Sequence, residues 1–208
     1  NLFRRTERTY QELLDGIMEE HIGIAQAGTV IYGKGILNNG IHMIDLVRML
    51  FGEIISVQTL GLGKNLELSG YVDVDVVAAL TLDSGAVITM HPVDFSHYRD
   101  VLLDVWGTRG RLEIIQEGLI LRRSPLKEHR ALEGVMELAM DEPVTLTSYI
   151  RTSLYQVYDN LENAMQESKQ PLSSLENAIR SEMVVEAVKT SIRMGGSVVS
   201  LASMEKLA

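Results

Sequence analysis

The stretch that decides the fold reads GKGILNNGIHMIDLVRMLFG and spans residues 33–52. Two asparagines and a glycine precede an apolar run that ends at Gly52, a pattern typical of a capped, mostly buried helix of about three turns. At about 100° per residue, one side of this helix carries four polar residues: Asn38, His42, Asp45 and Arg48. The positions from 41 to 51 on its other sides are apolar, so we expect the polar stripe to line a cleft or to pair internally.

This run resembles the signature of the C-terminal domain of the Gfo/Idh/MocA family of NAD(P)-dependent sugar oxidoreductases. That signature has a glycine-rich entry, then Asp-x-x-x-His, a short spacer and an Ile-Asp pair. By this resemblance His42 is the catalytic histidine, and Asn38 stands where the family usually has aspartate. Asparagine at that place resembles the branch that acts on nucleotide-linked sugars. We therefore predict His42 and Asn38 as the catalytic residues.

The chemistry that the resemblance implies suits an imidazole. Oxidation of a sugar alcohol needs hydride loss to the nicotinamide and proton loss from the hydroxyl, and a neutral histidine near pH 7 can take that proton. If the helix starts at Asn39, its N-terminal dipole favours the neutral ring of His42. Asn38 can orient the imidazole or a sugar hydroxyl, but it cannot stabilise an imidazolium as an aspartate would. The alternative is that His42 is a core histidine, satisfied by Asn38 or by a backbone carbonyl.

Composition sets the class of protein. The 208 residues are 46% hydrophobic and 23% charged, typical of a soluble globular protein with room for one good core. A formal net charge of -9 argues against binding a nucleic-acid backbone. We find no apolar run long enough to span a membrane and no signal peptide, so we predict no membrane partner. The absence of cysteine excludes disulfides and fits a cytoplasmic protein.

Helical periodicity covers both ends of the chain. It predicts a helix over residues 3–18, followed by a strand over 22–32. A second helix is expected from Thr147 to about Ser168. A capping box, with Ser173 as the cap and Glu176 as its return contact, opens a third helix, which runs through Ile192 and ends at Gly195-Gly196 before a short strand at Val198-Val199.

The middle of the chain has the pattern of strands. Val, Ile and Leu dominate six segments: residues 54–62, 73–82, 86–95, 98–106, 111–116 and 119–123. The short links at 83–85, 108–110 and 117–118 are typical of hairpins, so neighbouring strands should be antiparallel. Residues 127–146 are left without an assignment. We predict an α+β fold with an open, predominantly antiparallel sheet and helices on one face, like the family's dihydrodipicolinate-reductase-like C-terminal domain, over residues 1–208 as a single domain.

The strand at 73–82 is apolar on both sides, which indicates that both sheet faces are covered. The predicted helices are enough to cover one face of the sheet. The family's C-terminal domains associate through their open sheets, so we predict a homodimer or a tetramer through the other face.

The resemblance implies a cofactor, NAD or NADP, that this chain does not hold. Gly61-Leu62-Gly63 lacks the third glycine and the following helix of a dinucleotide loop. The chain thus resembles the C-terminal half of a two-domain oxidoreductase, in which a missing Rossmann domain binds the cofactor, and alone it should be inactive. Its substrate would be a sugar or nucleotide-sugar alcohol or ketone. The alternative is a non-catalytic sugar-sensing or interaction module on the same fold.

Other candidate substrate-binding residues are Lys34, Arg5, His97 and Tyr98. Arg5 comes from the resemblance, since an arginine near the start of the family's domain lies close to the substrate, and Arg4 fits that place equally. The alternative for these side chains is exposure on turns. Asp45 and Arg48 are spaced as a structural ion pair, and Trp106 should pack in the sheet. His91, Asp94 and His97 lack the spacing of a metal site, so we predict no metal.

Overall fold

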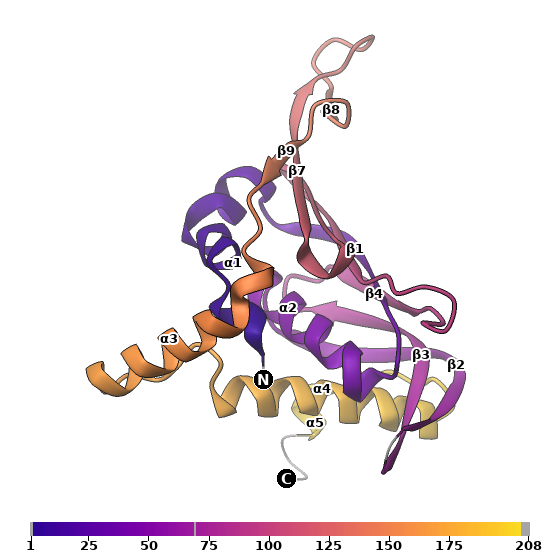
Figure 1. Cartoon of the computed structure of the whole chain (residues 1–208). Coiled ribbons are helices and arrows are strands. Elements are labelled where there is room, and N and C mark those ends of the chain that lie inside the picture. The colour runs from indigo at the N-terminus through magenta and orange to yellow at the C-terminus, as the bar shows by residue number, and fades with distance from the viewer. Residues whose placement is uncertain (1, 69, 205–208) are drawn as a thin grey trace.

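The computed structural model describes residues 2–68 and 70–204. They form an α+β fold on one ten-stranded sheet in the order β10-β2-β3-β4-β1-β5-β6-β7-β8, with β9 beside β7 (Figure 1). The strands are β1 (Ala25–Tyr32), β2 (Ile54–Leu68), β3 (Tyr71–Leu82), β4 (Val87–Pro92), β5 (Leu102–Gly107), β6 (Gly110–Ile115), β7 (Ile120–Glu128), β8 (Met136–Leu138), β9 (Val144–Leu146) and β10 (Val199–Ser200).

The predicted antiparallel sheet is confirmed. The three expected hairpin links join β3 to β4, β5 to β6 and β6 to β7, and each of these pairs is antiparallel. One pair differs, because β1 and β4 run parallel, with Thr29 opposite Thr89. Turn residues specify the pairing of consecutive strands. β1 and β4 are not consecutive in sequence, so no turn specifies their pairing, which depends on how the chain crosses the sheet.

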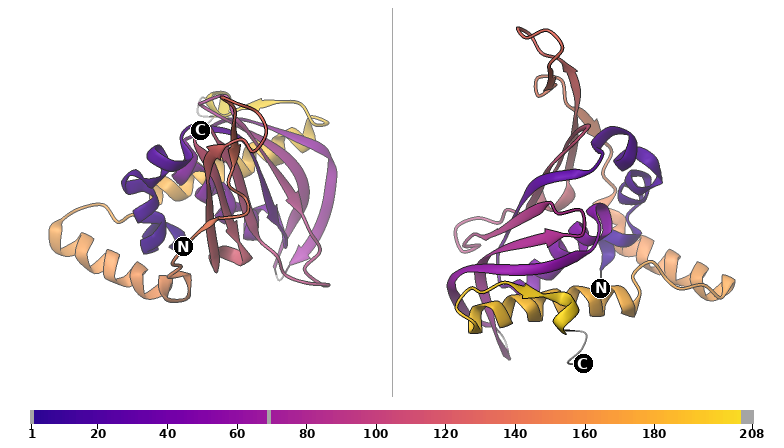
Figure 2. Two further views of the ribbon diagram at one scale, coloured as in Figure 1. Left: turned by 90° about the horizontal axis from the view of Figure 1, so that it is seen from above. Right: turned by 180° about the vertical axis from the view of Figure 1, so that it is seen from behind.

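Helices lie on one side of this sheet, and the opposite face is open (Figure 2). The helices are α1 (Arg8–Glu12), α2 (Ile41–Phe51), α3 (Ser153–Glu167), α4 (Leu175–Arg193) and α5 (Leu201–Met204). α2 and α4 pack together, with α4 along the bottom of the view, while α3 and the β7–β8 arm project from the body (Figure 1). None of the helices in the described ranges combines the length and the apolar character needed to cross a membrane.

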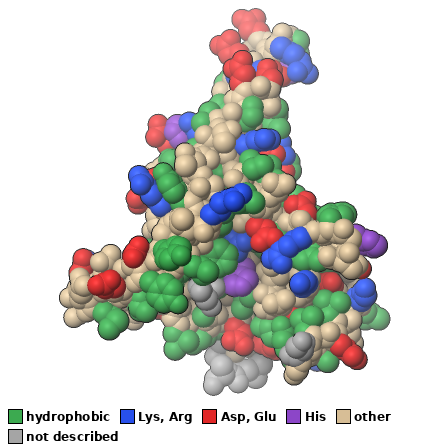
Figure 3. Space-filling model, in the orientation of Figure 1, with side chains coloured by type: hydrophobic (Ala, Val, Ile, Leu, Met, Phe, Trp, Pro, Cys, Tyr) green, Lys and Arg blue, Asp and Glu red, His purple; other side chains and the backbone are tan. Residues whose placement is uncertain are grey.

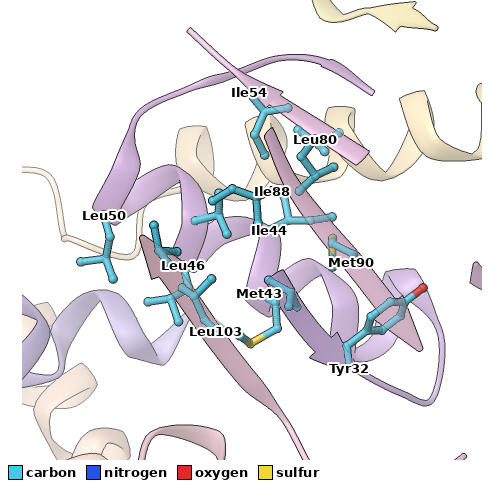
Figure 4. Packing of buried hydrophobic residues seen from close by; sticks show 14 of the residues in the cluster. Tyr32, Met43, Ile44, Leu46, Leu50, Ile54, Leu80, Ile88, Met90 and Leu103 are labelled. Carbon is cyan, nitrogen blue, oxygen red and sulfur yellow. The ribbon is translucent and has the colours of Figure 1, made fainter. Parts of the chain in front are cut away.

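Strand β3 shows why one face became the core. Val76, Ala78, Leu80 and Leu82 alternate along it and are almost fully buried, whereas Val77 and its neighbours on the other face stay partly exposed. Alternation with period two places these sets on opposite faces. The buried set meets Met43, Ile44 and Leu46 of α2 in a continuous apolar cluster (Figure 4).

The helix predicted over residues 3–18 is wrong as a single element. The chain instead forms a 3-10 turn (Phe3–Thr6), the short α1, and a wide, π-type helical segment (Leu13–Ile22). Gly16 has a φ of 122°, which breaks regular helical geometry inside that segment. Apolar residues repeat at helical spacing on both sides of this glycine, so their periodicity hides the break.

Other boundaries also shift. The cap of α4 is Ser174, whose hydroxyl accepts from the Asn177 N–H, while the predicted cap Ser173 accepts from the Leu2 N–H. The helix expected from Thr147 begins as a 3-10 turn at Ile150 and becomes α3 at Ser153. Residues 98–101 form a loop before β5, and the unassigned stretch 127–146 contains β8 and β9.

Leu80 and Leu62 provide a matched test of this core. Leu80 is fully buried, whereas Leu62 on the neighbouring strand is 75% exposed. We expect Leu80→Ala to lower the free energy of unfolding by about 2–5 kcal/mol, because it removes buried apolar area and leaves a cavity. Leu62→Ala should change it by less than about 0.5 kcal/mol. Urea unfolding of both variants measures the difference, and equal losses would contradict the assigned faces.

Candidate active site

The N-terminus of the organising helix is held by carboxylates from β3. A wide helical turn over Ile36–Gly40 precedes α2, so helical structure begins before the Asn39 that the sequence suggested. Asp73 accepts from the N–H groups of Leu37 and Asn38, at 3.1 and 2.9 Å to its Oδ2, and Asp75 accepts from the Gly35 N–H at 2.8 Å. Such carboxylates satisfy the free N–H groups of a helix start. These carboxylates therefore offset part of the positive end of the helix dipole one turn before His42.

His42 lies on the polar side of α2, half-buried against the N-terminal segment. Its ring and that of Phe3 are 5.9 Å apart between centroids and are tilted by 51°. Burial, followed by the positive charge of Arg4, lowers the pKa of His42 from 6.5 to about 4. Neither ring nitrogen hydrogen-bonds to another residue in the described part of the chain. The imidazole is thus neutral near pH 7 and free to exchange a proton with a ligand.

A second polar residue of α2 holds the N-terminal segment in place. The Arg5 guanidinium contacts Asp45 through Nε, at 2.9 and 3.0 Å from the two carboxylate oxygens, and through Nη2 at 2.8 Å. Asp45 is 1% exposed and also accepts from the Ser181 hydroxyl of α4 at 3.2 Å. The carboxylate therefore ties three segments together, and it fixes Phe3 and Arg4 beside His42.

The last member of the polar stripe completes this network. Arg48 lies 3.7 Å from Asp45, which confirms the predicted structural pair. It donates to both Glu53 oxygens at 2.8 and 2.9 Å, and to Ser181 at 2.8 Å. The stripe thus has two uses. Asp45 and Arg48 pair internally, whereas His42 packs against Phe3 and takes no part in that network.

A cavity of about 630 Å³ lies on the far side of Phe3. Its wall combines the 116–119 turn, the start of α3 and the loop before β5: Phe3, Arg99, Gln116, Glu117, Leu119, Ile150, Arg151, Ser153 and Leu154. Arg99 and Glu117 form an ion pair across it. His42 does not itself line this cavity, and Phe3 connects the two, because its ring contacts His42 and also forms part of the cavity wall.

The remaining predicted residues surround this region unevenly. Asn38 precedes His42 by one turn, with an exposed side chain and its N–H bonded to Asp73. His97 and Tyr98 are exposed in the loop that carries Arg99 into the cavity wall. Lys34 is exposed with a φ of 59° in the turn before the helix. Their roles in binding stay predictions.

Sequence reasoning missed several residues. Phe3 and Glu117 were not singled out, because an isolated aromatic and a turn carboxylate carry no spacing signal. Asp73 lies 35 residues from the N–H group that it accepts from, so only the folded sheet brings them together. The pair of arginines at 4 and 5 was noticed, and the structure separates them: Arg5 is bound by Asp45, whereas Arg4 lies beside His42.

Comparison with protein families gives a direct assignment. The model for "Oxidoreductase family, C-terminal alpha/beta domain" of Gfo/Idh/MocA proteins matches residues 33–201. The chain belongs to the Gfo/Idh/MocA oxidoreductase family. The match includes the helix that carries His42 and most of the sheet. No curated protein matches the chain.

Solved structures share this Gfo/Idh/MocA fold. An oxidoreductase from Agrobacterium radiobacter, in complex with NAD+, L-tartaric acid and magnesium, superposes with a TM-score of 0.68 at 16% identity, over 98% of this chain and 65% of that one. Levoglucosan dehydrogenase with NADH and L-sorbose gives 0.72 at 18% identity, over 96% and 64%. An NAD binding oxidoreductase from Klebsiella pneumoniae gives 0.73 at 15% identity, over 97% and 65%. The chain therefore spans 64–65% of the length of these proteins.

The pKa of His42 can be measured by NMR titration of its ring protons. The pKa, about 4 in the folded chain, lies below the ordinary value of 6.5, so protonation favours unfolding. The stabilising contribution is complete above about pH 6.5 and is lost as the pH falls toward 4. We expect Arg4→Gln to raise the midpoint, because it removes the neighbouring charge. His42→Asn identifies the signal, and a wild-type midpoint near 6.5 would contradict the described environment.

Proposed function

We propose that this chain is the substrate and oligomerisation domain of an NAD(P)-dependent oxidoreductase that acts on a sugar or nucleotide-sugar alcohol or ketone. His42 is its acid/base. The observation that carries this proposal is a neutral histidine on the family's signature helix, whose ring nitrogens have no hydrogen-bond partner among the described residues and whose ring contacts Phe3 of the cavity wall. A core histidine would instead be hydrogen-bonded to a neighbour.

The described residues do not fit the cofactor by themselves. Gly61 and Gly63 lie inside β2, at an irregularity of its pairing with β3, and no helix follows them. A dinucleotide needs a strand, a glycine loop and a helix N-terminus for its pyrophosphate. We propose that a separate domain of the protein binds NAD or NADP, which accepts or returns the hydride.

The residues of this chain then carry out the proton transfer. His42 takes the proton of a substrate hydroxyl during oxidation and gives it back during reduction. Arg4 disfavours the imidazolium, and no carboxylate contacts the ring among the residues described. We therefore expect His42 to pass its proton on rather than to keep it. Asn38, one turn earlier, is placed to orient a hydroxyl of the substrate.

The substrate class rests on the family and on its solved members. The Gfo/Idh/MocA neighbours hold L-sorbose, levoglucosan or L-tartaric acid, all of which are small polyhydroxylated molecules. The cavity beside Phe3 has a volume in the range of small-molecule sites, about 300–1,000 Å³. Lys34, His97 and Tyr98 are further candidates for contacts to the substrate. Arg5 was predicted with them, but its guanidinium is held by Asp45.

The acid/base role is tested in the protein that carries this chain together with its cofactor-binding domain. We expect His42→Asn to lower kcat by about 10²-fold or more, the scale of lost general acid–base catalysis, with cofactor affinity nearly unchanged. His129→Asn, in the β7–β8 arm, is the matched control. Unchanged turnover in the His42 variant would remove it from the mechanism. A wild-type protein without turnover would favour a non-catalytic sensing module.

We also propose that the open sheet face associates two copies. Ile31, Val77, Ala79 and Leu102 lie on it and are partly exposed, and Val87 is 40% exposed beside them. The apolar part of this face lies on β1, β3 and β4 and on the first residue of β5. Pairing such faces about a two-fold axis removes this apolar area from water.

Sedimentation at micromolar concentration tests the assembly. We expect a mass of two or four times the single-chain 23.1 kDa. Val87→Asp should shift the equilibrium toward the single chain, because it buries a charge in the contact. Met165→Asp, on the projecting α3, should leave the mass unchanged. A mass of one chain throughout a dilution series would show that the face has no partner copy.

A further inference from the structure

The cavity beside Phe3 differs in charge from the rest of the molecule. The chain has 28 acidic and 19 basic residues. Arg99 and Arg151 nevertheless line the cavity, against a single carboxylate from Glu117. Figure 3 shows basic side chains between the hydrophobic and acidic patches on this side of the molecule. An excess of positive charge in a concave site attracts anions.

The cationic groups here are not all neutralised. The Glu117 carboxylate is paired with Arg99, whose Nη2 lies 3.1 Å from the Glu117 Oε2. Glu7, the buried carboxylate nearby, accepts from the backbone N–H groups of Tyr10 and Tyr149 at 3.0 and 2.6 Å. Across the ranges that the structure describes, no carboxylate lies within ion-pair distance of Arg151. The cavity therefore keeps one guanidinium available to a ligand.

A second cation lies behind the wall. Arg4 is 6% exposed, its Cζ lies 4.7 Å from the centroid of the Phe3 ring, and its Nη2 contacts the Glu117 carbonyl at 3.4 Å. Its Nε has no hydrogen-bond partner among the described residues. Burial lowers the pKa of Arg4, and the carboxylates of Glu117 and Asp45 offset part of that effect. Arg4 therefore adds positive charge behind the cavity wall.

The backbone of the wall is also strained. Gln116 and Glu117 both have positive φ, at 50° and 62°, although neither is glycine. Such conformations are strained for residues other than glycine and cluster at functional sites. Here the strain turns the Glu117 side chain toward Arg99 and its carbonyl toward Arg4. Leu119, with Phe3 and the start of α3, gives the cavity an apolar side that suits the C–H face of a ring.

We propose that this cavity binds a carboxylate or phosphate group of the substrate, so that the substrate class is an acidic sugar: a sugar acid or a sugar phosphate. The anion lies at Arg151 and Arg99, and the reacting carbon lies at His42, on the other side of Phe3. Arginine is suited to either group, because its planar fork matches carboxylate and phosphate oxygens. The position of the reacting carbon rests on the proposed function of His42. The anion site does not depend on that function.

Binding of matched sugars to the 208-residue chain tests the site by calorimetry. The probes are D-glucose, D-glucuronate and D-glucose 6-phosphate, which share a ring and differ at the terminal carbon. We expect one or both anions to bind at least about tenfold more tightly than glucose, the scale of one charge-assisted contact. The tighter of the two anions identifies the group that the site prefers.

Variants with opposite expected effects sharpen this test. Arg151→Gln should remove most of the preference for the anion, and Glu117→Gln should increase it, since it frees Arg99 from its carboxylate. Arg130→Gln, whose side chain is 83% exposed in the β7–β8 arm, keeps the preference and controls for net charge. Thermal unfolding of each variant confirms the fold, and Arg151 is exposed, so its loss leaves the core intact.

Three results would overturn the proposal: equal affinity for the three sugars, no saturable binding of either anion at millimolar concentration, or a preference that survives Arg151→Gln and Arg99→Gln. These measurements need no cofactor and no turnover. Failure of the oxidoreductase proposal would appear in the kcat of the His42 variant and would leave the ratio of affinities unchanged.

Discussion

The buried carboxylate of Asp45 is the interaction on which the rest of the site depends. It lies on α2 and is contacted by Arg5 from the N-terminal segment, by Ser181 from α4 and, at longer range, by Arg48 from its own helix. Removing one partner of such a network leaves an uncompensated buried charge, which typically costs 3–5 kcal/mol. Segments more than 130 residues apart in sequence are therefore fixed to one another by a single side chain.

The environment of His42 follows from that contact. Phe3 and Arg4 immediately precede the clamped Arg5, so Asp45 helps to set their positions against the imidazole, together with the contact of Arg4 to the Glu117 carbonyl. Burial of the ring and the positive charge of Arg4 both disfavour the charged form of the histidine. Asn38 stands where the Gfo/Idh/MocA signature usually has a carboxylate, and this adds to the same effect, since no negative charge is supplied one turn before the ring. These neighbours together keep the imidazole neutral near pH 7.

The two faces of the sheet differ in how they are covered. One face packs on α2 and α4 and forms the continuous core, while the other remains open, with small and β-branched side chains along β1, β3 and β4. α3 projects from the body with Tyr155, Tyr158 and Met165 each more than 70% exposed. Monomeric proteins rarely expose such area without a use. The chain spans 64–65% of its structural neighbours, which is consistent with further protein covering part of it.

The sequence by itself determined the α+β class, the hairpins, the organising helix and the candidacy of His42, because each depends on local periodicity, turn residues or a contiguous signature. The wrong predictions also have local causes. The helix predicted over residues 3–18 is interrupted at Gly16, which the sequence hides because apolar residues keep helical spacing on both sides of that glycine. The cap of α4 was placed one residue early, because two adjacent serines can both serve as caps. Only the tertiary structure decided the parallel pairing of β1 with β4, the capping of the helix start by Asp73, and the choice of Arg5 for Asp45 and Arg4 for His42. Those contacts join residues 35 or more positions apart, and pairing over such separations is set by how the chain packs, which neighbouring residues do not encode.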